Sequence, residues 1–118
     1  MSATDTRHLI EQALERLYSE VPALKQLKLV IKLELQVRGD APIWRIEVPG
    51  PKIERHPAGD ARVDIVVQRQ QFNTLAEEGT LRDWERAYER GHVKVTGDSS
   101  VVKLLGGVVG RQLARTRG

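Results

Sequence analysis

Apolar residues along residues 5–20 recur at the spacing of one helix face. The positions that are three or four residues apart are Leu9, Ile10, Ala13, Leu14 and Leu17. This repeat is typical of an amphipathic helix that covers a core with one side. Pro22 follows the segment and disfavours its continuation. The pattern therefore predicts one amphipathic helix near the start of the chain.

The pattern then changes to an alternation of apolar and polar residues, which is typical of a strand with one buried face. Residues 27–37 alternate in this way, and residues 43–48 do so again after a turn-forming Gly-Asp-Ala-Pro stretch. A short third strand is predicted around Ile53, after Gly50-Pro51. Because the connections are short, the three strands predict an antiparallel meander.

The middle of the chain continues with one strand and two helices. Residues 61–68 form a fourth alternating strand, in which Val63, Ile65 and Val67 face inward. Helical spacing follows on both sides of Gly79, and the apolar positions are Phe72, Leu75, Ala76, Leu81, Trp84, Ala87 and Tyr88. Thr80 precedes the second helix and is predicted to cap it, with Asp83 at the third helical position.

Residues 92–97 predict a short fifth strand, and a last helix follows that Asp98 or Ser99 is expected to cap. When successive residues are placed 100° apart around the helix axis, the apolar side chains of this helix fall within an arc of about 180°. They are Val101, Val102, Leu104, Leu105, Val108, Val109 and Leu113. The element order predicts an α+β domain whose helices collect on one face of the sheet.

Three glycines, Gly106, Gly107 and Gly110, fall outside this apolar arc, on the back of the last helix. Each glycine costs a helix about 0.5–1 kcal/mol relative to alanine. Two interpretations remain open. The helix is an ordinary packed element whose glycines admit a close neighbour, or it is a weak cover that shifts to let a ligand in.

Composition sets limits on the class of protein. The 118 residues fit one domain, taken as residues 1–118. The net charge of +3 comes from interleaved charges, and aromatic residues make up only 4%, which disfavours a nucleic-acid binder. Without cysteine, disulfides and thiolate zinc sites are excluded. We expect a cytoplasmic protein, because neither a signal peptide nor a membrane-spanning apolar run is recognisable.

No catalytic or metal-binding constellation stands out in the sequence. The three histidines, His8, His56 and His92, lack the spacing of metal ligands. Ser99 and Ser100 stand at a helix start without the G-x-S-x-G pattern, which favours capping over nucleophilic catalysis. We therefore expect a protein that is not an enzyme and needs no metal or cofactor. Binding an apolar molecule is a function that requires no such motif.

The basic end of the chain allows two interpretations. Arg111, Arg115 and Arg117 either form a solvated helix end, where cations suit the helix dipole, or contact anionic lipid headgroups transiently.

The order of short motifs from residue 43 to residue 105 resembles the sterol carrier protein type-2 domain. It comprises a tryptophan-started strand, an alternating strand, a helix before a glycine break, and a helix rising to G-x-h-x-h-x-G-D. The matching positions are Trp44, Ala61, Ile65, Phe72, Leu75, Gly79, Leu81, Ala87, Gly91, Val93, Val95, Gly97 and Asp98.

This resemblance implies a five-stranded, mixed but mostly antiparallel sheet with helices on one face, which enclose an apolar tunnel. It also implies non-catalytic binding and transfer of fatty acid, acyl-CoA, a sterol-like molecule or phospholipid. The alternative is an accessory module that acts by protein interaction in a lipid- or quinone-handling complex. We expect the tunnel to be lined by Ile65, Phe72, Leu75, Leu81, Trp84, Tyr88, Leu104, Leu105 and Val108. The ligand, the pathway and the oligomeric state stay open.

Overall fold

The computed structural model describes the chain from residue 3 to residue 116. Its elements follow the predicted order, with a short 3-10 helix, η1, added after the first helix. They are α1 (Ala3–Glu20), η1 (Pro22–Gln26), β1 (Leu29–Gln36), β2 (Ile43–Val48), β3 (Lys52–Arg55), β4 (Val63–Gln68), α2 (Arg69–Glu78), α3 (Leu81–Glu89), β5 (Val93–Gly97) and α4 (Ser99–Thr116).

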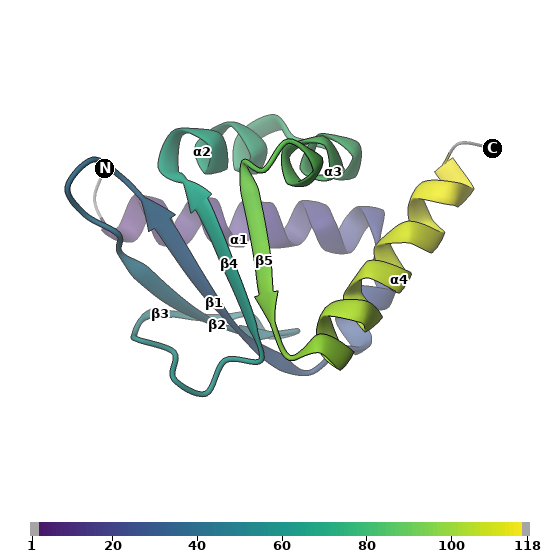
Figure 1. Cartoon of the computed structure of the whole chain (residues 1–118), viewed down its shortest axis with the longest axis horizontal. Helices are drawn as coiled ribbons and strands as arrows, with labels where there is room; N and C mark the ends of the chain where they lie inside the picture. Colours follow the sequence, from purple (N-terminus) through teal and green to yellow (C-terminus); the bar gives the residue numbers. More distant parts are fainter. Residues whose placement is uncertain (1–2, 117–118) are drawn as a thin grey trace.

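The strands form one five-stranded sheet in the order β3-β2-β1-β4-β5. The meander of β1, β2 and β3 is antiparallel, as predicted, and β4 pairs antiparallel with β5. The β1 and β4 strands are parallel neighbours, so the chain crosses over between β3 and β4. The mixed, mostly antiparallel α+β architecture is thereby confirmed (Figure 1).

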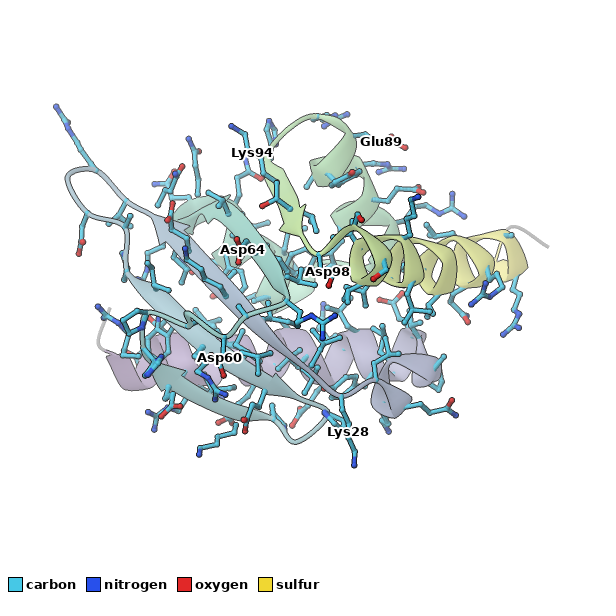
Figure 2. The ribbon with its side chains drawn as sticks, turned by 60° about the horizontal axis from the view of Figure 1, so that its bottom comes forward. Lys28, Asp60, Asp64, Glu89, Lys94 and Asp98 are labelled. Carbon is cyan, nitrogen blue, oxygen red and sulfur yellow. The ribbon has the colours of Figure 1, made fainter. Side chains whose placement is uncertain are left out.

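The alternation in the sequence sorts side chains onto two faces of this sheet. Ile53, Ile46, Ile31 and Val63 stand in one register row across four strands and share the face toward the helices. None of the helices that the structure describes covers the opposite face, which carries charged side chains (Figures 1 and 2). There Arg45 forms ion pairs with the carboxylates of Asp60, Glu47 and Glu54, at 2.7, 2.9 and 3.4 Å. Figure 2 brings this open face forward, with Asp60 and Asp64 labelled.

Four helices supply the second layer. In Figure 1, α1 runs behind the sheet, α2 and α3 lie along its upper end, and α4 stands at one side. The main core lies between the sheet, α1 and α2, where Ile10, Leu35, Trp44 and Val67 are at most 1% exposed. A second, smaller cluster joins α4 to the end of α1 and the start of α3. It consists of Val21, Leu81, Val108 and Leu113.

Side-chain caps fix where α3 and α4 begin. Thr80 and Asp83 exchange hydrogen bonds with each other's backbone N–H groups, which confirms the predicted cap of α3. Asp98 accepts hydrogen bonds from the backbone N–H and the hydroxyl of Ser100, at 3.0 and 2.6 Å, so Asp98 caps α4. These bonds, with an ion pair to Arg62 at 2.7 Å, hold the pKa of Asp98 well below its usual range.

Gly97, just before this cap, has a positive φ of 128°, and a Cβ there would stand 2.5 Å from the carbonyl oxygen of Arg62. Only glycine fits this turn from β5 into α4.

The first strand is shorter than the alternation predicts. Leu27 follows the 3-10 helix η1 as its C-cap residue, and Val37 makes an isolated bridge with Asp40 in the turn. At the start of the strand the alternating pattern extends further, because Leu27 still faces the same side as the inner residues of the strand and lines the pocket described below.

Candidate functional site: an apolar pocket

An apolar hollow in the described part of the chain has a volume of about 460 Å³. It lies between the inner face of the sheet and the helices α1, α3 and α4. Members of both buried clusters reach its wall, for example Phe72 from the main core and Leu81 from the second. The pocket is therefore the space that remains where two separately packed clusters meet.

Its wall is almost entirely hydrocarbon. The inner face of the sheet contributes Leu29, Ile31, Leu33, Ile46, Val48, Val63, Ile65, Val93 and Val95. The helices and the segment around η1 contribute Ile10, Ala13, Leu14, Leu17, Tyr18, Leu24, Leu27, Phe72, Leu81, Trp84, Glu85, Tyr88, Val102, Leu105, Gly106, Val109, Gly110 and Leu113. The pocket is open to solvent, because Tyr88, Gly106 and Gly110 in its wall are exposed.

Aromatic rings shape the wall below α3. Phe72 and Trp84 pack edge to face with ring centroids 6.3 Å apart, which is a favoured arrangement for such a pair. Phe72 is buried in the main core and the half-buried Trp84 packs against that core, so the pair joins this wall to it.

Six of the nine residues that the sequence suggested for the tunnel line this pocket. They are Ile65, Phe72, Leu81, Trp84, Tyr88 and Leu105. The structure places the other three elsewhere. Leu75 is buried in the main core, Val108 is buried in the second cluster, and Leu104 is 49% exposed on the outside of α4.

The reason for the difference on α4 is the way that this helix is rotated about its axis. The face that lines the pocket carries Val102, Leu105, Gly106, Val109, Gly110 and Leu113. At 100° per residue, this face is turned by about 80° from the arc that hydropathy predicts. Val108 thereby packs against the second cluster, and Leu104 is left in solvent.

The same rotation corrects the predicted position of two glycines. Gly106 and Gly110 line the pocket instead of lying on the back of the helix, and only Gly107 lies off the pocket. At Gly106 and Gly110 a Cβ would meet nothing within 4 Å. These glycines therefore admit no close neighbour, as one sequence interpretation supposed, but leave volume to the pocket. Whether the helix moves to admit a ligand stays a prediction.

Three polar residues interrupt the apolar wall. The hydroxyl of Tyr18 donates a hydrogen bond to the carbonyl of Pro49 at 3.0 Å, and partial burial raises its pKa. Tyr88 is 55% exposed at the opening. Glu85 is half-buried on α3 between Leu81 and Tyr88. Sequence reasoning missed Glu85, although a signal existed, since its position falls on the apolar face of α3.

The other candidate groups lie outside the pocket. Ser99 and Ser100 open α4 beside Asp98, and Arg111 and Arg115 are exposed near the other end of that helix. Arg117 lies outside the described residues. Within residues 3–116, no group of histidine, aspartate or glutamate side chains could hold a metal ion. None of the helices in this range is long and apolar enough to cross a membrane.

No protein-family model and no curated protein sequence matches this chain. Solved structures match it along most of its length. The solution structure of palmitated SCP2L2 from Aedes aegypti matches with a TM-score of 0.59 and 16% identity, over 85% of this chain and 93% of that one. This chain has a sterol carrier protein 2-like fold.

Two further structures support the sterol carrier protein 2-like fold. The crystal structure of SCP2-like 2 from Aedes aegypti matches with a TM-score of 0.57 and 20% identity, over 87% of this chain and 98% of that chain. Sterol carrier protein domain 2 of Helicoverpa armigera matches with a TM-score of 0.61 and 12% identity, over 90% of this chain and 85% of that one. The resemblance in the order of motifs is thus confirmed as a resemblance in fold.

Proposed function

We propose that this chain binds one apolar molecule of the lipid class in its pocket and carries it, without chemical change. Fatty acid, acyl-CoA, sterol-like and phospholipid ligands belong to this class. The observation that carries the proposal is a pocket of about 460 Å³ whose wall is almost entirely aliphatic and aromatic. The likeness in fold to the palmitated structure supports it.

The volume of the pocket limits the size of the ligand. A water-sized group occupies about 30 Å³, so the pocket holds roughly fifteen such groups. This space suits one acyl chain or one small ring system, and a larger molecule would have to leave part of itself in solvent. At about 0.8 kcal/mol per buried methylene, the gross gain is on the order of 10 kcal/mol. Association costs at least about 4 kcal/mol of this, so we expect micromolar affinity at best.

A carrier function also fits the chemistry of the wall. Among the residues that the structure describes, the wall holds the carboxylate of Glu85 and the hydroxyls of Tyr18 and Tyr88, and no histidine, serine or lysine that could form a nucleophile and base pair. We therefore propose binding and release as the whole activity.

The two tryptophans of the chain provide an internal test. Trp84 lines the pocket, whereas Trp44 is 1% exposed in the main core and does not line it. A brominated long-chain alcohol quenches indole fluorescence on contact. We expect it to quench the Trp44→Phe variant, which retains Trp84, in a saturable way, and to leave the Trp84→Phe variant unchanged. Equal or absent quenching in both variants would refute binding in this pocket and leave a protein-interaction module as the function.

We propose that the basic end of α4 brings the protein into transient contact with a membrane for transfer. Arg111 and Arg115 are exposed on the helix that forms one wall of the pocket. Each cation near an anionic surface contributes about 1 kcal/mol. Binding to vesicles that contain phosphatidylserine should therefore weaken in the Arg111→Gln, Arg115→Gln variant. Unchanged binding, or equal binding to neutral vesicles, would contradict this part of the proposal.

A further inference from the structure

The wall of the pocket carries very little charge. Among the described residues that line it, Glu85 alone is charged, and none is basic. A ligand with a carboxylate or phosphate head would thus find no cation in this wall. It would find one carboxylate of the same sign as its own.

Glu85 occupies a position where the fold of α3 favours an apolar residue. Leu81 lies one turn before it, Tyr88 lies one turn after it, Trp84 precedes it directly, and all of them line the pocket. The Glu85 side chain is half-buried. Its carboxylate oxygens are not fully buried, so water reaches them while no ligand is bound.

The described part of the protein supplies no hydrogen bond to this carboxylate. Within residues 3–116, the Glu85 carboxylate makes neither a hydrogen bond nor an ion pair, whereas Asp60, Asp83 and Asp98 each accept hydrogen bonds from neighbouring groups. The free acceptor at an otherwise apolar wall therefore suits a donor that the ligand brings.

We propose that Glu85 selects amphiphiles with a neutral, hydrogen-bond-donating head, such as a long-chain alcohol or a hydroxylated ring, over amphiphiles with a carboxylate head. This inference rests on the proposed lipid-binding function and specifies its ligand class. A ligand hydroxyl donates to the Glu85 carboxylate, and a hydrogen bond to an ionised acceptor is about twice as strong as a neutral one. A ligand carboxylate instead brings a second negative charge next to that of Glu85 in an otherwise apolar wall, which disfavours the ionised ligand.

The test compares dodecanol with dodecanoate as competitors of a neutral fluorescent lipid probe, at a pH where dodecanoate is ionised. The quantity measured is the ratio of the two dissociation constants in each variant. Dividing a variant's ratio by the wild-type ratio removes the intrinsic difference between the two compounds. We expect Glu85→Gln to lower the preference for the alcohol at least tenfold, and Glu85→Lys to lower it further.

Glu89 supplies the matched control, because it lies one turn after Glu85 on α3, is exposed, and does not line the pocket. Figure 2 shows it at the outer edge of the molecule. Glu89→Lys changes the net charge as much as Glu85→Lys does, and it should leave the ratio unchanged. Thermal melting of each variant verifies that it is folded, and the isosteric Glu85→Gln gives the test if the lysine variant does not fold.

The possible failures are distinguishable. If the wild-type protein binds both compounds and the ratio is the same in Glu85→Gln, Glu85→Lys and Glu89→Lys, the role of Glu85 is refuted while lipid binding stands. If both lysine variants shift the ratio equally, the effect is one of overall charge, and the role of Glu85 is again refuted. If the folded wild-type protein binds neither compound nor the probe, the proposed function fails and this inference fails with it.

Discussion

Gly106 and Gly107 are adjacent on α4, yet only Gly106 lines the pocket, so the same substitution at the two positions separates pocket volume from helix stability. A Cβ at Gly106 meets nothing within 4 Å, and one at Gly107 makes an ordinary contact of 3.5 Å with the guanidinium of Arg111. Alanine at either position should therefore raise the free energy of unfolding by about 0.5–1 kcal/mol through helix propensity.

Leucine at the two positions should have different effects on ligand binding. Its four side-chain carbons occupy roughly 120 Å³, about a quarter of the 460 Å³ pocket, if they enter from Gly106. A ligand that fills the pocket loses about four buried methylenes, worth about 3 kcal/mol or roughly a hundredfold in affinity. A shorter ligand should lose much less.

Titration of hexadecanol and octanol against a fluorescent lipid probe provides the assay. We expect Gly106→Leu to weaken hexadecanol far more than octanol, and Gly107→Leu to bind both as the wild type does. If Gly106→Leu and Gly107→Leu weaken binding equally, or if neither changes the dependence on chain length, the pocket face of α4 is wrongly assigned. Circular dichroism of both variants establishes that α4 is formed.

Three further predictions concern stability. Asp98→Asn should lower the melting temperature at neutral pH. Because the pKa of Asp98 is lowered in the folded state, its carboxylate stabilises the fold above the ordinary aspartate pKa of about 4, and this stabilisation is lost as the pH falls below it. The difference in melting temperature between Asp98→Asn and the wild type should therefore shrink between about pH 7 and pH 2. A difference that stays constant would contradict this linkage. Thr80→Ala should cost about 1 kcal/mol in chemical denaturation by removing the cap of α3, and no loss would mean that the cap is not stabilising. Leu35 is 0% exposed, so Leu35→Ala should lower the free energy of unfolding by about 2–5 kcal/mol. Ile65→Ala should lower it less, because Ile65 already borders the pocket. Equal losses would indicate that the pocket is filled by protein.

The local pattern of the sequence determined most of the fold, because a period of two or of 3.6 fixes which side chains share a face. The alternation in β1, β2 and β4 assigned Leu33, Ile46 and Val63 to the buried face, and the Thr80–Asp83 spacing located the start of α3. The parallel pairing of β1 with β4 is different, since it depends on contacts between segments about thirty residues apart and on how the sheet is covered. The mixed sheet was predicted from the resemblance in the order of motifs and not from periodicity.

Part of the pocket could likewise be predicted from the sequence, and part of it depends on tertiary packing. Apolar composition without a catalytic set indicated a hollow for an apolar molecule, and six lining residues follow from helix and strand faces. The rotation of α4 was decided only in three dimensions, because Val108 and Leu113 pack against Val21 and Leu81 on other elements. That packing turns Gly106 into the pocket, and hydropathy along a single helix carries no information about its partners.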